Sequence, residues 1–321
     1  MIVREGLQGL RSISPGSAVT IGNFDGVHQG HRHIIDTCNA LRSRCPSGKI
    51  AVVTFEPHPL TVLKPELAPP RLTLPPTKQR LLAESGVDEY IVLPPTAEVL
   101  GLSAEQFWML LKDEARVAHL VEGGNFTFGK NRGGNIQRLR EWSADTDVAV
   151  HVVTPVLRPM LDMQIAPISS SLIRFLVDAG RIRDAAICLG RPYVLEGPVI
   201  KGHQRGRTIG IPTANLDCAD LMIPADGVYA ARCTLNGRAH AVALSIGTMP
   251  TFGQNNRQVE AYILDFDGDL YGQHLEVEVI DWLREQWKLP GIDALKTQIA
   301  KDVAIIRTVV RELDPTKMIG H

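Results

Sequence analysis

The chain has 321 residues, 44% of them hydrophobic, which is enough for two compact domains that each bury a core. Thirty-four Lys and Arg residues balance 35 Asp and Glu residues, so the formal net charge of −1 excludes a global field that attracts polyanions. The five cysteines form no C-x-x-C pair, which disfavours a disulfide framework or a zinc ribbon. The sequence shows neither an apolar leader nor a run of about 18 apolar residues, which predicts a soluble cytoplasmic protein.

Short β-type runs alternate with helix-length stretches over the first 190 residues. The expected strands are Ala18–Gly22, Lys49–Phe55, Glu89–Leu93, Ala118–Glu122 and Val148–Val153. This alternation is typical of βαβ units and predicts an α/β domain with a Rossmann-like parallel sheet. Seven prolines lie between Pro57 and Pro76, so we expect an extended loop there, and long loops inside domains are often lids.

The pattern changes after Gly190. The expected strands are Val194–Ile200, Gly227–Leu235, Arg238–Ile246, Val259–Leu264 and His274–Trp282. Asn236–Gly237 is a strong hairpin signal, and one long helix is expected from Asp293 to about Val310. We therefore predict a small antiparallel β-barrel with a C-terminal helix. The linker falls near Ala179–Arg191, which gives domains of residues 1–186 and 187–321.

A glycine-bearing turn follows the first expected strand and leads into His28-Gln29-Gly30-His31 and a helix that continues to about Leu41. Backbone N–H groups of such a turn, with the positive end of a helix, form a phosphate site at the carboxyl edge of the sheet. His28 and His31 share one helix face and can donate hydrogen bonds to an α-phosphate during in-line attack. Gly30 lets a nucleotide approach without meeting a Cβ. Two surface histidines are the alternative, which the position after the first strand disfavours.

The H-x-G-H motif in this position resembles the nucleotidylyltransferase superfamily. The surrounding residues narrow the resemblance to the bacterial FAD synthetase module, which is similar in four segments: Gly22–His31, Thr54–Pro59, Gly124–Gly129, and Ile168–Ser171 with Arg174.

The resemblance implies an ATP site and a flavin site. The implied ATP contacts are Gly22, Asn23, Phe24, Asp25, His28, Gly30, His31, Asn125, Ser170, Ser171 and Arg174. Phe55, Pro57 and Asn125 are the implied flavin contacts. The chain departs from the family where Ser171 replaces Thr, Leu172 replaces Arg and Pro95 replaces Phe; the loss of the Arg charge bears on adenylylation.

A second motif runs from Gly202 to Asn215 and combines a glycine-rich basic loop with a Thr-x-Asn pair. Thr213 and Asn215 alternate along an extended strand and face the same side, where a hydroxyl and an amide carbonyl suit Mg²⁺ bridging ATP phosphates. Glycines alone are more typical of an ordinary hairpin loop, but the whole G-x-x-x-G-x-P-T-A-N string resembles the riboflavin kinase signature. The implied ATP contacts are Gly202, Gly206, Arg207, Thr208, Gly210, Pro212 and Thr213.

By its position in the resembling segment, Glu260 matches the catalytic base of riboflavin kinases. A carboxylate in reach of the attacking hydroxyl can accept its proton. Arg284 matches a flavin-contacting arginine, and Trp282 and Trp287 can cover an aromatic ring. The family usually has Asn at Ser245 and His at Tyr262, and we interpret both changes as packing.

The resemblance spans about residues 15–310 and predicts a bifunctional riboflavin kinase/FMN adenylyltransferase. The expected partners are riboflavin, FMN and ATP with Mg²⁺, without nucleic acid or membrane, for a monomer or weak homo-oligomer. One alternative is another nucleotidylyltransferase or a class I aminoacyl-tRNA synthetase fragment, which leaves the kinase motif unexplained. The other is a riboflavin kinase whose N-terminal module only binds nucleotide or flavin.

Overall fold

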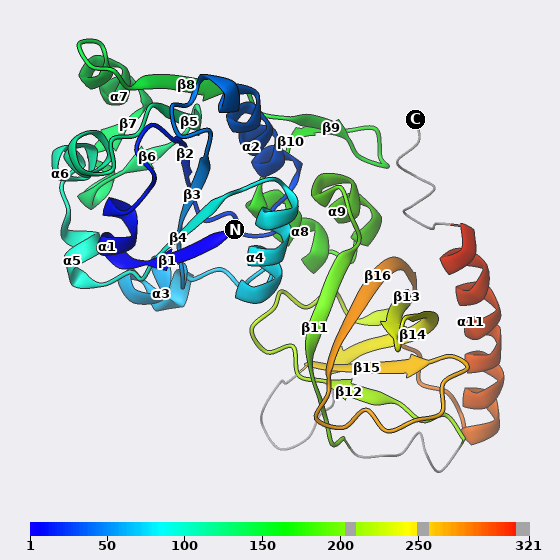
Figure 1. Cartoon of the computed structure of the whole chain (residues 1–321). Helices are drawn as coiled ribbons and strands as arrows, with labels where there is room; N and C mark the ends of the chain where they lie inside the picture. The colour runs from blue at the N-terminus through cyan, green and yellow to red at the C-terminus, as the bar shows by residue number, and fades with distance from the viewer. Residues whose placement is uncertain (203–209, 249–256, 313–321) are drawn as a thin grey trace. The chain divides into compact units, whose positions relative to one another are not determined.

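The computed structural model describes residues 1–202, 210–248 and 257–312. The chain forms two compact units, shown in Figure 1: residues 1–157 with 166–168, and residues 158–165 with 169–321. This division groups helices α8 (Ser170–Asp178) and α9 (Ile182–Leu189) with the second unit. The predicted functional boundary after residue 186 would assign α8 and the first five residues of α9 to the first module, and that assignment stays a prediction.

The first unit is built on a six-stranded, fully parallel sheet with strand order β1-β4-β3-β2-β5-β8. The strands are β1 Ile2–Glu5, β2 Ala18–Ile21, β3 Ile50–Phe55, β4 Glu89–Leu93, β5 His119–Gly123 and β8 Ala149–Val153. The predicted Rossmann-like sheet is confirmed. β1 escaped prediction because it is a short edge strand whose side chains are largely exposed, so it carries no buried apolar run.

Helices cover both faces of this sheet. The α-helices are α1 Gly6–Arg11, α2 Gln29–Leu41, α3 Leu60–Leu63, α4 Pro75–Glu84, α5 Ala97–Gly101, α6 Ala104–Met109 and α7 Ile136–Ser143. The short 3₁₀ turns are η1 Arg42–Arg44, η2 Pro65–Leu67 and η4 Lys130–Arg132, and η3 Leu110–Glu114 is a π-helical turn. A small hairpin is formed by β6 Thr127–Phe128 and β7 Gly134–Asn135. α2 and α4 pack on one face, whereas α1, α5, α6 and α7 pack on the other. Burial on both faces explains why the strands read as continuous apolar runs.

The prediction of an extended loop throughout Pro57–Pro76 is wrong in part. The segment contains the one-turn helix α3 and the turn η2, and α4 begins inside it at Pro75. Pro65 and Pro75 stand in the first turn of their helices, where a missing N–H costs nothing and a fixed φ favours the helix.

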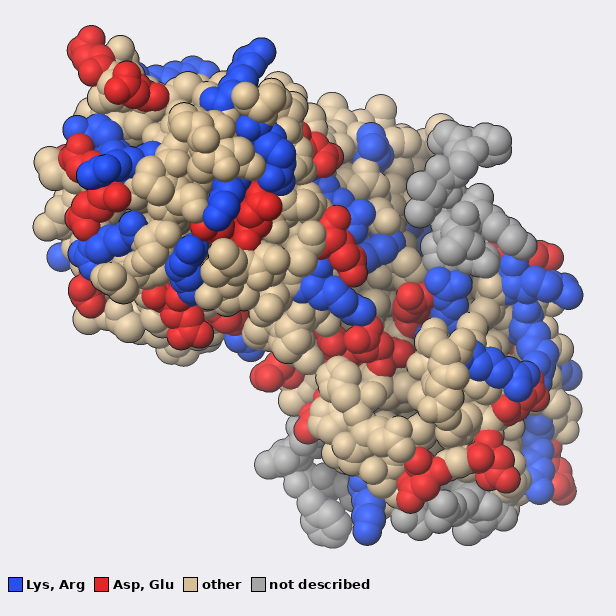
Figure 2. Space-filling view, in the orientation of Figure 1, with Lys and Arg blue, Asp and Glu red and all other residues tan. Residues whose placement is uncertain are grey.

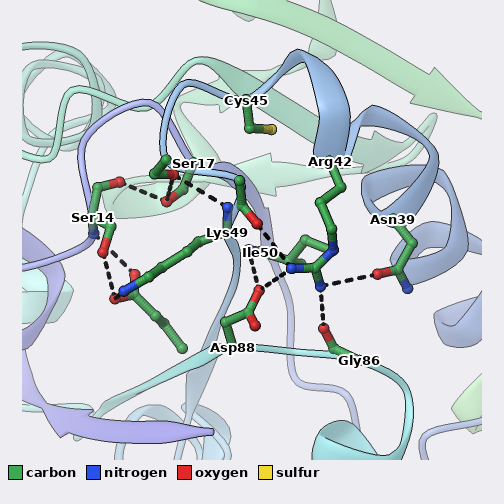
Figure 3. Close-up of polar contacts among 12 residues, drawn as sticks. Ser14, Ser17, Asn39, Arg42, Cys45, Lys49, Ile50, Gly86 and Asp88 are labelled. Carbon is green, nitrogen blue, oxygen red and sulfur yellow. Dashed lines mark hydrogen bonds and ion pairs between the residues drawn. The ribbon is translucent and has the colours of Figure 1, made fainter.

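A polar network ties together the amino ends of the central strands (Figure 3). The Arg42 guanidinium donates to Asp88 and to the Gly86 carbonyl, each at 2.8 Å. Asp88 in turn accepts from the Ile50 N–H at 2.9 Å, where β3 begins. Glu89 is fully buried; burial alone would raise its pKa, but hydrogen bonds from Ser14 and Arg4 outweigh that effect and lower it. This end of the sheet is occupied by structural contacts, which leaves the carboxyl ends for a site.

The second unit contains a closed barrel with strand order β11-β12-β15-β14-β13-β16. Its strands are β11 Tyr193–Ile200, β12 Ala214–Leu216, β13 Gly227–Leu235, β14 Arg238–Thr248, β15 Arg257–Ile263 and β16 His274–Arg284; the ribbon β9 Leu157–Pro159/β10 Ile165–Pro167 precedes α8. Asn236 and Gly237 have φ values of 50° and 76°, as a tight hairpin turn requires. Helix α11 (Ile292–Glu312) packs on the barrel's outer face through Ile306. The predicted barrel and C-terminal helix are confirmed.

Charged side chains of both signs are interspersed over the face of the molecule in Figure 2. All five cysteines are free and buried. In the part of the chain that the structure describes, no helix is long and apolar enough to cross a membrane.

Candidate functional sites

The first candidate site lies at the carboxyl end of β2, where the strand order reverses between β2 and β5. In open α/β sheets, ligands bind in the crevice at such a switch point. The paired register of these two strands stops at Val19 and Leu120. Beyond it, the fully buried Glu122 carboxylate oxygen accepts from the Ile21 N–H at 2.8 Å. The Glu122 side chain thus replaces the backbone hydrogen bonds between β2 and β5 just before the turn that follows β2.

The turn itself has an unusual backbone. Phe24 and Val27 adopt φ values of 48° and 38°, although neither is glycine, and both side chains are buried. A β-branched residue in this region is a conformational outlier, and such strain persists only where the surroundings over-determine the backbone. The turn is therefore held in one conformation, as a site for phosphate oxygens requires.

His28 is the N-cap of α2, and its Nδ1 accepts from the His31 N–H at 3.3 Å. With Nδ1 acting as the acceptor, the proton of a neutral His28 ring is on Nε2. The two imidazole rings stack with centroids 3.6 Å apart. A Cβ on Gly30 would lie 3.2 Å from the His28 ring and 3.5 Å from the Ile168 carbonyl oxygen. Gly30 therefore makes room for the histidine ring, in addition to its predicted role toward a nucleotide.

Asp25, predicted as an ATP contact, binds a neighbouring loop. Its buried carboxylate accepts from the Leu72 N–H at 3.0 and 3.1 Å and from the Thr73 N–H at 3.2 Å. Thr73 Oγ1 accepts from the Gly26 N–H at 3.2 Å. These bonds join the turn after β2 to the end of the proline-rich segment.

Sequence reasoning missed a charged cluster beside the same turn. Glu56 pairs with Arg71 at 2.5 Å and with the buried Lys78 at 2.7 Å. Lys78 Nζ also donates to the Asn23 carbonyl oxygen at 3.4 Å, which additionally accepts from Thr54 Oγ1 at 3.0 Å. Burial opposes ionisation of Glu56, but Lys78 and Arg71 outweigh it and lower the pKa of that carboxyl. Lys78 carried no signal of its own, because its partners are distant in sequence.

The remaining predicted residues of the first unit lie near the carboxyl ends of β2, β3 and β5. Asn125 is exposed in the loop after β5. Phe55, at the end of β3, packs against the core, and the exposed Pro57 follows a cis peptide bond with Glu56. Gly22 donates its N–H to the Val53 carbonyl at 3.0 Å, which fixes the exit of β2.

The serine-rich motif opens helix α8 in the second unit. Ser169 is the N-cap, since its hydroxyl accepts from the Leu172 N–H at 3.2 Å. Ser170 therefore does not cap the helix. Ser170, Ser171 and Arg174 lie in the first turns of α8, and their contact with ATP stays a prediction.

The second candidate site is on the barrel. Glu260 on β15 stands directly opposite Asn215 on β12 and Ser245 on β14. Side chains directly opposite each other in antiparallel strands lie on the same face. A carboxylate, an amide and a hydroxyl therefore form a row across three adjacent strands.

Glu260 and Ser245 of this row border a cavity of about 520 Å³ on the side of the barrel that α11 covers. The cavity is lined by Ile211, Thr213, Val228, Ala243, Leu244, Ser245, Glu260, Tyr262, Arg284, Ile292, Leu295, Ile299 and Asp302. Ser245 and Tyr262 thus belong to its wall, and the interpretation of both changes as packing stays a prediction. Its largely apolar lining with a few convergent polar groups is typical of a site for a small organic ligand.

A second cavity of about 310 Å³ adjoins β12 and the 266–271 segment. It is lined by Pro212, Thr213 and Ala214 and also by Asp267 and Asp269. Thr213 lies on the wall of both cavities. One hydroxyl-bearing residue therefore stands between the two spaces.

The Thr213–Asn215 pair fits a cation that arrives with a nucleotide. A Cβ on Gly202 would overlap the Asn215 amide, so the glycine makes room for that side chain. Across residues 1–202, 210–248 and 257–312, no three His, Cys, Asp or Glu side chains cluster as a metal site. Two oxygen donors complemented by phosphate oxygens are typical of Mg²⁺ sites. Gly206, Arg207 and Thr208 lie outside the described residues, whereas Gly210 is described and has a φ of 78°.

Arg284 lies on the wall of the larger cavity, and Trp287 covers its guanidinium with the ring centroid 4.7 Å away. Trp282, the predicted flavin contact, does not line this cavity in the described residues; its indole lies against Gly180 and Gly227. The structure therefore places Trp287 over the Arg284 guanidinium, and the flavin contact of Trp282 stays a prediction.

A parallel α/β unit with a histidine pair at its switch point, joined to a barrel with a carboxylate-lined cavity, defines a two-domain nucleotide-dependent transferase. Family models described as FAD synthetase and riboflavin kinase match residues 10–171 and 189–310. The chain belongs to the bifunctional riboflavin kinase/FMN adenylyltransferase family.

Two relatives with that name cover nearly the whole chain. The protein from Pseudomonas fluorescens is 35% identical over 95% of this chain and 96% of its own, and that from Buchnera aphidicola is 31% identical over 96% and 97%. A solved structure described as a macrolide-efflux protein from Streptococcus pneumoniae is 30% identical, with a TM-score of 0.84 over 96% of this chain and 99% of that one.

Proposed function

We propose that the barrel phosphorylates riboflavin to FMN and that the histidine turn adenylylates FMN to FAD. The observation that carries the first reaction is the shared wall at Thr213. The smaller cavity would hold ATP and the larger cavity riboflavin, so that the transferred phosphoryl group passes beside Thr213.

In the kinase reaction, Glu260 accepts the proton of the ribityl hydroxyl as its oxygen attacks the γ-phosphorus of ATP. The bond between the γ-phosphorus and the bridging oxygen breaks, and ADP leaves. Thr213 and Asn215 would hold Mg²⁺, which when bound neutralises part of the charge on the phosphates. Arg284 and Trp287 would contact the flavin ring.

In the adenylylation reaction, the FMN phosphate attacks the α-phosphorus of a second ATP and pyrophosphate leaves. His28 Nε2–H donates to the α-phosphate oxygens, where negative charge develops. His31 stacks on His28 and supports the same contact. Asn125, Ser170, Ser171 and Arg174 complete the ATP contacts, and Phe55 and Pro57 are the proposed flavin contacts of this module.

Two variants separate the sites. The protein is supplied with ATP, Mg²⁺ and either riboflavin or FMN, and ADP, pyrophosphate and the flavins are quantified. His28→Ala should abolish pyrophosphate release and FAD while sparing ADP and FMN; Glu260→Ala should do the reverse. His33→Ala on the same helix and Glu276→Ala on β16, both exposed positions, serve as controls.

The outcomes also decide between the main proposal and a chain whose first module only binds its ligands. FMN without FAD from the unmodified protein would reduce that module to a binding domain. Loss of both reactions in a folded single variant would contradict the two-site proposal.

A further inference from the structure

One face of β14 forms part of the wall of the larger cavity. Side chains alternate between the two faces of a strand, so Ala243, Ser245 and Gly247 share a face. Ala243 and Ser245 line the cavity. At the third position, a Cβ on Gly247 would overlap the side-chain amide of Gln286. The glycine therefore leaves room for an amide group beside Ser245.

The Gln286 amide orients the Ser245 hydroxyl. Gln286 Nε2 donates to Ser245 Oγ at 3.0 Å. A hydroxyl group has one hydrogen to donate and two lone pairs that accept. Because the amide takes one lone pair of the Ser245 oxygen, the hydroxyl hydrogen points away from Gln286 and can be donated into the cavity that Ser245 lines. The wall thus presents a hydrogen-bond donor at this position.

The strand order places this donor on the side of Glu260 that faces away from the proposed ATP contacts. β15 lies between β12 and β14, so Glu260 has Asn215 opposite it on one side and Ser245 on the other. Side chains directly opposite each other have Cβ atoms about 4.5–5.5 Å apart. In the proposed kinase reaction, the γ-phosphate lies toward Thr213 and Asn215 and the attacking hydroxyl lies beside Glu260. Because the attacking oxygen and the leaving group are in line on opposite sides of the phosphorus, the rest of the alcohol extends toward Ser245.

We propose that Ser245 recognises the ribityl chain of riboflavin by donating a hydrogen bond to one of its secondary hydroxyls, and that Gln286 orients Ser245 for this contact. A flavin whose chain lacks these hydroxyls leaves the Ser245 donor unpaired in the cavity, so it is the poorer substrate. Ser245 is a specificity-determining residue, and Gln286 is a positioning residue that acts through it. This inference rests on the kinase activity proposed above, and it competes with packing as the explanation of Ser245.

The test compares two alcohols by the ADP that the full-length protein releases. One is riboflavin, and the other is 7,8-dimethyl-10-(5-hydroxypentyl)isoalloxazine, which keeps the flavin ring and the terminal hydroxyl but lacks the secondary hydroxyls. The selectivity is the ratio of kcat/KM for riboflavin to kcat/KM for this analogue. In Ser245→Ala the selectivity should fall about five- to tenfold, which is the effect of one hydrogen bond. A packing role, or a hydrogen bond from Ser245 to the flavin ring or to Glu260, would change both values of kcat/KM together and leave the selectivity unchanged.

Two replacements of Gln286 test the direction of the Ser245 hydroxyl. Gln286→Glu keeps the size of the side chain but replaces its NH₂ group by an oxygen that only accepts, so Ser245 donates to it and turns its hydrogen away from the cavity. The selectivity should then fall as far as in Ser245→Ala. Gln286→Met removes donor and acceptor together, and Ser245 can still donate into the cavity, so the selectivity should fall only about twofold.

Gln273→Glu is the matched control for the added negative charge. Gln273 is exposed on the same barrel, and its Nε2 donates to the Asp269 carbonyl at 2.9 Å and not to a residue that lines the larger cavity. This variant should leave the selectivity unchanged.

An unchanged selectivity in Ser245→Ala would overturn the proposal, and so would equal selectivities in Gln286→Glu and Gln286→Met. If Ser245→Ala does not fold, the two Gln286 variants decide the question, because that side chain is exposed. Failure of the unmodified protein to release ADP from riboflavin would instead refute the proposed function.

Discussion

Replacing Asp25 tests whether the turn after β2 depends on the loop that it binds. Asp25→Ala removes the acceptor of two buried N–H groups, those of Leu72 and Thr73. The Asn variant keeps an oxygen that can accept both bonds but places an NH₂ group against the Leu72 N–H. We expect Asp25→Ala to be the more damaging change.

The number of hydrogen bonds that Asp25 accepts sets the expected loss of folding free energy. Hydrogen bonds to a charged acceptor contribute about 1.5–3 kcal/mol each, and the Ala variant loses two of them. A loss of at least about 3 kcal/mol is a large share of the roughly 5–15 kcal/mol that stabilise a domain. For a unit of roughly 150 residues, this corresponds to a fall of about 6–12 °C in the unfolding midpoint.

The assay follows heat inactivation of the two reactions in the same chain. The midpoint for pyrophosphate release from FMN and ATP should fall in Asp25→Ala, while the midpoint for ADP release from riboflavin and ATP stays unchanged. Asp88→Ala is the control, because Asp88 also accepts from a backbone N–H of this unit, that of Ile50, but at the opposite end of the sheet. It should lower the same midpoint by less and leave the KM for FMN unchanged.

A different result would refute the reasoning. If Asp25→Ala abolished pyrophosphate release at every temperature, with no loss of thermal stability, Asp25 would contact the ligand and its bonds to the loop would be dispensable.

Three further predictions follow from the same contacts. Burial raises the pKa of Glu122, so the contribution of this carboxyl to stability is present below its unfolded-state pKa and is lost as pH rises through its folded-state pKa. Glu122→Gln should therefore resist alkaline denaturation better than the unmodified protein. A difference in stability that does not depend on pH would contradict this prediction. Tyr229→Phe leaves the Ala225 carbonyl without its 2.6 Å donor and should cost about 1–2 kcal/mol, measured as the heat-inactivation midpoint for ADP release. Chelation of divalent metal should stop ADP release, and Thr213→Val should raise the KM for Mg·ATP with little change in the KM for riboflavin.

Much of the fold could be predicted because its signals are local. Glu89–Leu93 and Gly227–Leu235 form strands with the predicted limits, since apolar runs and turn residues lie within a few positions of each other. Asn236–Gly237 forms the predicted turn for the same reason. Proline counting misled us in the 57–76 segment, because a proline in the first turn of a helix favours the helix.

The sequence by itself determined the two-domain order, the parallel sheet, the barrel and the motifs around His28, Thr213 and Glu260. Only the tertiary structure decided which side chains surround them. Asp25 and Thr73 are 48 residues apart, and Arg284 and Asp302 are 18 apart on different elements. Such pairs leave no periodic trace, because long-range contacts depend on how elements pack and not on the spacing of residues within them. The sequence thus identifies the segments that contain the predicted site residues, and packing decides which charged groups and hydrogen-bond partners surround those residues.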